Sequence, residues 1–119
     1  MRAIENHHIS SGMKQIHNSS IKFMQSANFF LDSVIADFVN IIGCDNLLEA
    51  INCRSDTFQR GEIIYTTQSL QHIIISYSLT KIYHNSEKYN INPAITPDFT
   101  LPTSDFREIV LAWRNFIST

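Results

Sequence analysis

The chain predicts an α+β fold, with N-terminal helices, a central antiparallel sheet of three or more strands and a C-terminal amphipathic helix. Three observations indicate this fold: apolar residues recur at helical spacing over residues 28–42, the spacing shortens toward two after Gly61, and helical spacing returns after Pro102. At 119 residues the chain is expected to form one domain, residues 1–119. A chain of this length buries roughly two thirds of its unfolded surface, so a substantial core is expected.

Residues 1–20 are polar and only weakly patterned. Asn, Ser and His dominate, and Ser10-Ser11-Gly12 interrupts any regular element. We therefore expect a loosely ordered arm with one short strand or helix near residues 13–16. Met13 is an alternative starting point for the ordered part of the chain.

A long helix is predicted over residues 28–42. Ser26 or Asn28 can begin it, and Gly43 stands where a left-handed glycine would end it. Its apolar face consists of Leu31, Val34, Ile35, Phe38, Ile41 and Ile42. Asp45 can then cap a short second helix, whose apolar residues are Leu47, Leu48 and Ile51. A polar loop follows.

Two short segments flank the longest stretch with strand character. Residues 62–67 contain β-branched and aromatic side chains, and so do residues 89–93, whose last residue, Pro93, would end the strand. Residues 85–87 are expected to form a turn, and residues 93–102 a connection to the final helix.

The stretch over residues 70–84 alternates as a single long strand would. One face carries Ile73, Ile75, Tyr77, Leu79 and Tyr83, and the other carries His72, Ser76, Ser78, Thr80 and His84. Ile74, Tyr77 and Lys81 are also compatible with a helix, so a helix over residues 71–84 remains the alternative.

The C-terminal residues predict an aromatic-rich helix that closes the core. Pro102 stops the preceding segment, Thr103 or Ser104 can cap the helix, and Asp105 and Glu108 sit near its positive end. Its apolar stripe consists of Phe106, Ile109, Val110, Trp113, Phe116 and Ile117. We expect Trp113 to be mostly buried, touching both the sheet and the long helix.

Composition excludes several functional classes. A net charge of −2 disfavours nucleic-acid binding through a broad basic surface. No apolar run reaches the length of a membrane span, and the N-terminus lacks the apolar stretch of a secretory signal, so a cytoplasmic protein is expected. Cys44 and Cys53 are then expected to be reduced thiols that pack as small buried side chains. The alternative is that they form a redox pair or bind a metal ion.

No catalytic, cofactor-binding or metal-binding residues are predicted, and the chain is not expected to be an enzyme. Its glycines are isolated, so there is no phosphate-binding loop. His7-His8 has no further ligand nearby for a metal ion. His72 and His84 share the polar face of the expected long strand, and a general base there would need a partner that the sequence does not place. Exposed strand histidines are the simpler interpretation.

Acidic side chains are concentrated in the middle of the chain. Residues 32–62 hold six of them against two basic residues. A solvated helix and loop surface is one interpretation; the other is electrostatic docking to a basic protein. On the second interpretation the binding residues are Asp37, Asp45, Glu49, Asp56 and Glu62. The sheet face around His72, Ser76 and His84 is the next candidate surface.

The order of helices, strands and a final helix resembles the immunity proteins of bacterial polymorphic toxin systems, in particular those of contact-dependent growth inhibition. The residues that carry the resemblance are Lys88-Tyr89-Asn90-Ile91-Asn92-Pro93 and Leu101-Pro102-Thr103, Phe106, Ile109-Val110, Trp113 and Phe116-Ile117. They cover about the last third of the chain.

The resemblance implies a protein without catalytic activity or cofactor. Such a protein binds the C-terminal toxin domain of a large exported effector as a 1:1 heterodimer and blocks its active site. Many of these toxins are nucleases with basic clefts, which an acidic inhibitor surface would fit. Direct binding to nucleic acid or membrane is not implied.

Two other functional classes remain open. A small cytosolic adaptor or secretion chaperone would be a homodimer with a broad apolar groove. A small enzyme would carry a catalytic site that the sequence does not reveal.

Overall fold

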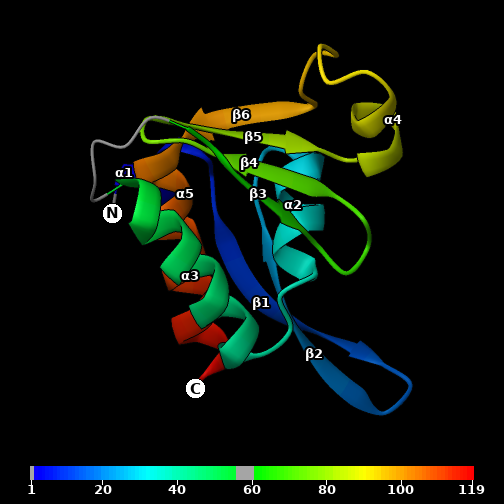
Figure 1. Ribbon diagram of the computed structural model, residues 1–119. Coiled ribbons are helices and arrows are strands. Elements are labelled where there is room, and N and C mark those ends of the chain that lie inside the picture. The colour runs from blue at the N-terminus through cyan, green and yellow to red at the C-terminus, as the bar shows by residue number, and fades with distance from the viewer. Residues whose placement is uncertain (1, 56–60) are drawn as a thin grey trace.

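A computed structural model describes residues 2–55 and 61–119 of the chain. The described residues form five helices and two antiparallel sheets (Figure 1). Their order along the chain is α1 (Arg2–Asn6), β1 (Ser10–Ile16), β2 (Ser19–Gln25), α2 (Phe29–Ala36), α3 (Ile41–Ser55), β3 (Ile63–Thr66), β4 (His72–Ile75), β5 (Leu79–Tyr83), α4 (Ser86–Ile91), β6 (Phe99–Pro102) and α5 (Thr103–Ile117). The expected α+β class is confirmed.

The larger sheet has four antiparallel strands in the order β3-β4-β5-β6. Every residue of β4 is buried, and Ile73 of β4 stands opposite Ile82 of β5. The edge strand β6 lies within residues 93–102, which were expected to be only a connection. The sheet of three or more strands is therefore confirmed, with one strand that the sequence pattern did not predict.

The expected single strand over residues 70–84 is wrong, because the chain turns back on itself at residues 76–78. The Ser76 backbone N–H donates to the Leu79 carbonyl at 3.0 Å, and its hydroxyl donates to the same oxygen at 2.8 Å. The Thr103 hydroxyl donates to the Ser76 carbonyl, which ties this turn to the start of α5. The helical alternative for residues 71–84 is excluded as well.

The expected long helix over residues 28–42 is divided into α2 and α3. Asn28 caps α2 as expected, since its Oδ1 accepts from the N–H groups of Phe30 and Leu31. The Oδ1 of Asn40 accepts from the Gly43 N–H at 2.7 Å and supports the start of α3. Gly43 therefore lies in the first turn of α3 and does not end a helix, and Asp45 does not begin one. A second asparagine cap outweighed the continuous apolar pattern.

The strand expected over residues 89–93 is wrong, because residues 86–91 form α4. The Asn85 side chain accepts from the N–H groups of Glu87 and Lys88, which caps this helix. The cap also replaces the turn expected at residues 85–87. Pro93 follows the end of the helix, where it cannot continue the hydrogen-bonding pattern.

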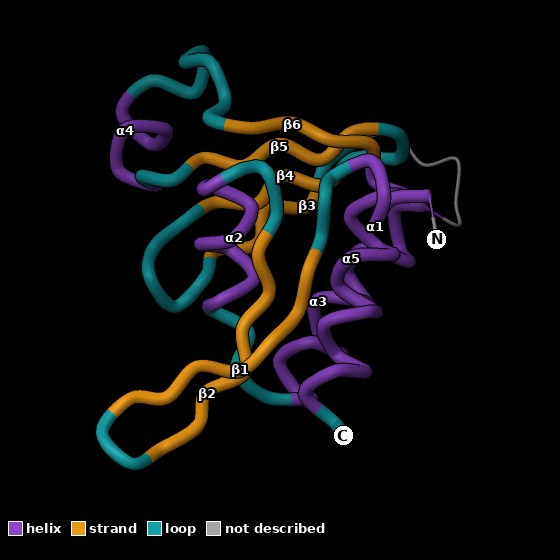
Figure 2. Tube along the Cα trace, turned by 180° about the vertical axis from the view of Figure 1, so that it is seen from behind, coloured by secondary structure: helices purple, strands orange, loops and turns teal. Residues whose placement is uncertain are grey.

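Residues 2–20, expected as a loose arm, form α1, β1 and the start of β2. Of the two alternatives expected near residues 13–16, a strand is present and not a helix: these residues belong to β1, which pairs with β2 in a separate sheet. Ala3 of α1 is buried in the core, and its N–H donates to the Glu108 carboxylate of α5 at 3.2 Å. Figures 1 and 2 show the far end of the β1–β2 hairpin projecting from the body of the molecule.

The C-terminal helix α5 packs along α3 and closes the core as expected (Figure 1). Phe106, Ile109 and Val110 are completely buried, and Trp113 is 4% exposed. The Trp113 indole N–H donates to the Phe38 carbonyl at 2.6 Å, which joins α5 to the end of α2. No side chain caps α5: Pro102 holds the cap position, and neither Thr103 nor Ser104 does so. The Thr103 hydroxyl instead donates its hydrogen bond to the Ser76 carbonyl.

Candidate protein-binding site

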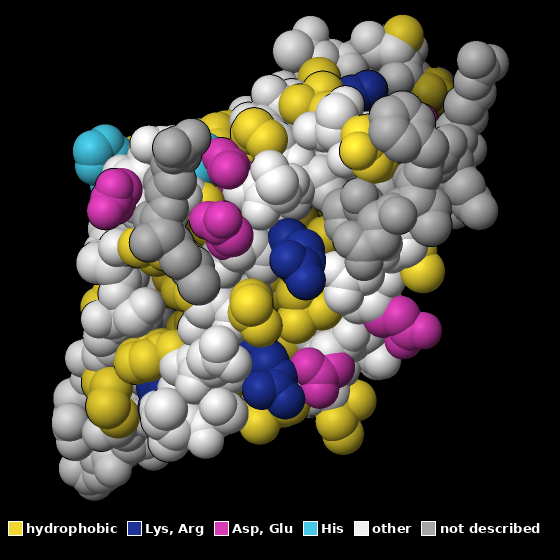
Figure 3. All heavy atoms as spheres, turned by 90° about the vertical axis from the view of Figure 1, so that its left-hand side faces the viewer, with side chains coloured by type: hydrophobic (Ala, Val, Ile, Leu, Met, Phe, Trp, Pro, Cys, Tyr) yellow, Lys and Arg dark blue, Asp and Glu magenta, His cyan; other side chains and the backbone are white. Residues whose placement is uncertain are grey.

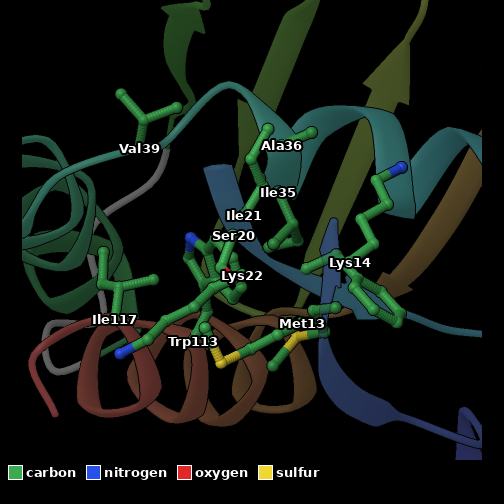
Figure 4. A pocket seen from close by; sticks show the side chains of 12 residues that line it. Met13, Lys14, Ser20, Ile21, Lys22, Ile35, Ala36, Val39, Trp113 and Ile117 are labelled. Carbon is green, nitrogen blue, oxygen red and sulfur yellow. The ribbon is translucent and has the colours of Figure 1, made fainter. Parts of the chain in front are cut away.

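An apolar groove of about 570 Å³ runs between β2, the end of α2 and the end of α5. Figure 4 shows Ser20, Ile21 and Lys22 between side chains of α2 and side chains of α5. The groove is lined by Met13, Lys14, Ser20, Ile21, Lys22, Phe23, Met24, Ile35, Ala36, Val39, Trp113 and Ile117. A cavity of this size is large enough for several amino-acid side chains.

The floor of the groove is the outer edge of β2. His17 and Asn18 both have positive φ values, 47° and 67°, as the two central residues of a type I′ hairpin turn do. Ile16 and Ser19 are therefore the hydrogen-bonded pair that closes the turn, and bonded pairs alternate with non-bonded pairs along the hairpin.

By this alternation Ser20, Lys22 and Met24 lie in non-bonded pairs, opposite Gln15, Met13 and Ser11 respectively. Their N–H and C=O groups point away from β1, and all three residues line the groove. Within the described part of the chain, no backbone hydrogen bond satisfies these outward groups. The groove therefore contains a strand edge that is open to pairing.

Apolar side chains around the groove are unusually exposed. Val39 is 70% exposed, Met13 59% and Ile21 44%. Ile42, in the first turn of α3, is 74% exposed and follows Val39 closely in the chain. Exposed apolar side chains that line one groove, as Val39, Met13 and Ile21 do, are typical of protein–protein interaction sites.

Lys14 and Lys22 are the charged residues of the groove lining, which contains no carboxylate. The Lys22 ammonium donates to the carbonyls of Phe116 and Thr119, at 2.9 and 2.6 Å, and lies 5.2 Å from the centre of the Phe116 ring. Lys22 therefore joins the hairpin to the end of α5, while Lys14 is exposed. Of the two lysines, Lys14 is the one left to interact with a bound segment.

Asp37, one of the predicted binding residues, is bonded within the protein. Its carboxylate accepts from the Ser69 N–H and hydroxyl and from the Gln71 amide, at 3.2, 2.7 and 3.0 Å. Burial acts to raise the pKa of this carboxyl, but hydrogen bonds from Ser69, Thr67 and Gln71 bring it below its ordinary value of 3.8. The geometry gives Asp37 a role in joining α2 to the β3–β4 turn.

The other predicted acidic residues are distributed over different elements. Asp45 and Glu49 lie one turn apart on α3, and both are exposed; Asp45 accepts from Arg114 Nε at 2.9 Å. Glu62, next to β3, lies 3.8 Å from the Lys81 ammonium. Asp56 lies outside the described residues. On the side of the molecule that carries α3 and α5, acidic and basic side chains are interspersed (Figure 3).

Of the two histidines expected to be exposed, His84 is exposed and His72 is not. His72 is 7% exposed, and its ring nitrogens bond the Thr66 hydroxyl at 2.9 Å and the Asn90 side-chain oxygen at 3.0 Å. His84 is exposed and lies 3.3 Å from the Gln71 side-chain oxygen. Ser76 belongs to the turn after β4. The buried position of His72 is explained by α4, which covers it and was not predicted.

The two cysteines differ in their surroundings. Cys44 is buried as expected, and burial raises the pKa of its thiol. Cys53 is exposed, contrary to expectation, because it lies on the outer side of α3. Across residues 2–55 and 61–119, no three potential metal ligands come together. None of the described helices has the length and apolar character that crossing a bilayer requires.

Sequence reasoning missed the groove, although part of its signal was present. Residues 21–24 read Ile-Lys-Phe-Met, which is compatible with a strand, and His17-Asn18 is compatible with a tight turn. The polar composition of residues 1–20 concealed this hairpin. The other walls come from residues more than ten positions away, which no local pattern connects.

Comparison with protein-family models, with curated proteins and with solved structures found no match for this chain.

Proposed function

We propose that this protein acts in the cytosol by binding another protein, as an immunity protein that blocks the active site of a cognate toxin domain. The observation that supports this most strongly is the open apolar groove beside the hairpin, with Val39, Met13 and Ile21 exposed around it. Protein interfaces commonly combine an apolar centre with a polar rim. The resemblance of α5 to the closing helix of immunity proteins supports the same class. Residues 88–93 add no support, because residues 86–91 form α4 and not the strand that would lead into such a helix.

The acidic residues of α3 are proposed as part of the rim. α3 begins two residues after Val39, so Asp45 and Glu49 follow the apolar surface along the helix. Glu49 is exposed and forms no hydrogen bond or ion pair with any side chain that the structure describes. A nuclease with a basic cleft is the toxin class that such carboxylates would fit. Asp37 is better explained by its internal hydrogen bonds.

The first test is the gene immediately upstream, which we expect to encode a large exported protein. The C-terminal domain of that protein is then co-expressed with this one. We expect the protein to restore growth to cells that produce this domain, and to form a 1:1 complex with it. Growth arrest that persists despite full expression of the protein would contradict the proposed function.

Charge reversal at Glu49 tests the rim. Coulomb attraction between exposed charges is screened by salt, so the association rate should fall as ionic strength rises. Glu49→Lys should slow association at low salt, whereas Glu87→Lys on α4 serves as the matched control because Glu87 is also exposed. Equal slowing in both variants would show that Glu49 is not part of the polar rim of the interface.

A second candidate is a small adaptor or secretion chaperone, which the apolar groove also favours. This class would form a homodimer, whereas the immunity protein is proposed to be monomeric before it binds its toxin. Light scattering after size-exclusion chromatography separates the two. A stable dimer at micromolar concentration would favour the adaptor.

A further inference from the structure

We propose that the groove binds an extended segment of the partner protein, which pairs with the outer edge of β2 as a third strand of the β1–β2 sheet. The inference rests on the proposed function for the identity of the protein that supplies this segment. The mode of binding rests on the groove alone.

The first argument is the orientation of the β2 backbone. Ser20 and Lys22 lie in non-bonded pairs with β1, so their N–H and C=O groups face the groove. An added strand would satisfy these groups with main-chain hydrogen bonds, as in other cases of strand addition. A helix lying in the groove has no free backbone groups along its length to offer them.

The second argument is the nature of the walls. Ile35 and Ala36 of α2 lie on one side of β2, and Trp113 and Ile117 of α5 lie on the other (Figure 4). Successive side chains of a strand point to opposite sides. A strand paired with β2 would therefore place alternate side chains against α2 and against α5. Because both walls are apolar, the segment is expected to be apolar on both faces.

The third argument is charge. The groove lining contains two lysines and no carboxylate, and the Lys14 side chain is exposed. An acidic residue in the bound segment would complement Lys14. β2 carries one lysine, Lys22, and a second copy paired antiparallel about this residue would place two Lys22 side chains next to each other, which disfavours self-pairing in that register. Ser20 to Met24 can pair with a segment of about five residues, given a rise of about 3.3 Å per residue.

The test selects eight-residue peptides from a displayed random library on the intact protein. We expect enrichment of peptides with a run of apolar residues and one carboxylate. Ser20→Pro removes one outward N–H, and an edge strand tolerates proline there. It should weaken binding of the selected peptide about tenfold, while Ser20→Ala, which keeps the N–H, should change it by less than about twofold.

N-methylation of the selected peptide gives a second measurement that leaves the protein unchanged. Methylating alternate backbone nitrogens should abolish binding, and methylating the intervening ones should not, because only every second N–H of a strand faces its neighbour. Three results would overturn the inference: enriched peptides with helical spacing, equal loss at every methylated position, or a dimer that occupies the groove.

The peptide experiment contains no toxin, so the two proposals can fail separately. Peptides that pair with β2, in a protein that does not neutralise the toxin, would refute the proposed function and leave strand pairing standing. If the protein neutralises the toxin but pairs with no selected peptide, the strand-pairing inference is refuted and the proposed function stands.

Discussion

The two antiparallel sheets of this protein differ in what covers them. In the four-stranded sheet every residue of β4 is buried, and the Thr80 hydroxyl of β5 bonds the Thr103 hydroxyl at 2.9 Å. In the two-stranded sheet, β2 is buried only at Met24, and its outer edge borders an open groove. An enclosed sheet stabilises a fold, whereas an open edge exposes backbone groups that another chain can bind.

The small sheet would not be stable alone. Two-stranded hairpins are marginal in water, so this one depends on its attachments to the body of the protein. Met24 is 8% exposed within the core, and Lys22 bonds the end of α5. The comparison therefore predicts large stability effects for substitutions in the enclosed part, and small ones around the open edge.

The largest effect is expected for Trp113→Ala. The side chain is 4% exposed and its N–H bonds the Phe38 carbonyl, so truncation leaves a cavity and an unsatisfied acceptor. We expect the free energy of unfolding to fall by about 3–5 kcal/mol in urea titrations. Trp113→Phe is the control: it keeps most of the ring and should cost about 1–3 kcal/mol for the lost hydrogen bond. A loss below about 1 kcal/mol for the alanine variant would show that Trp113 serves a partner and not the core.

A smaller effect is expected for Lys22→Ala, which detaches the hairpin from α5. The ammonium makes three hydrogen bonds, to the Phe116 carbonyl, the Thr119 carbonyl and the Thr119 hydroxyl. Because it is partly exposed, we expect a loss of about 1–2 kcal/mol in stability. Hydrogen exchange at residues 19–25 should accelerate more than exchange in β4. Lys14→Ala is the control. Similar acceleration of hydrogen exchange in both variants would show that Lys22 does not hold the hairpin to α5.

Asp37→Asn should lower stability by about 1 kcal/mol at neutral pH, because the carboxylate accepts bonds from Ser69 and Gln71. A carboxyl whose pKa is lowered on folding stabilises the protein fully above its unfolded value, near 3.8, and loses this contribution as pH falls through the lower folded value. The difference between the two proteins should therefore shrink below about pH 4 in urea titrations. Glu87→Gln is the control, and a difference that is undiminished at pH 3 would point to packing and not to charge.

The smallest effects on stability are expected at the open edge. Val39→Ser and Ile21→Thr change side chains that are 70% and 44% exposed, so stability should change by less than about 0.5 kcal/mol. If the groove binds a partner, the same substitutions should weaken that binding, as measured by calorimetry with the toxin domain. Ile91→Ser on α4, where the side chain is 78% exposed, is the matched control. Unchanged binding in the groove variants would remove the groove from the interface.

The sequence alone determined the α+β class and most of α5. Apolar spacing after Pro102 identified the residues that are buried in this helix, because helical periodicity directly decides which side chains share a face. Asn28 was recognised as a cap for the same local reason. Local patterns failed where two of them competed. The Asn40 cap outweighed the continuous apolar run over residues 28–42, and the Asn85 cap outweighed the strand propensity of residues 89–93.

The candidate site was decided by the tertiary structure. The sequence placed an acidic surface on Asp37, Asp45, Glu49, Asp56 and Glu62. The fold instead joins Asp37 to Gln71 and Asp45 to Arg114. The groove combines side chains of the β1–β2 hairpin with Ile35, Ala36, Val39, Trp113 and Ile117, and no short-range pattern specifies that these residues meet. Spacing along a chain fixes which side of an element is apolar. Which distant elements cover that side, and which edge they leave open, depends on how all of them pack together.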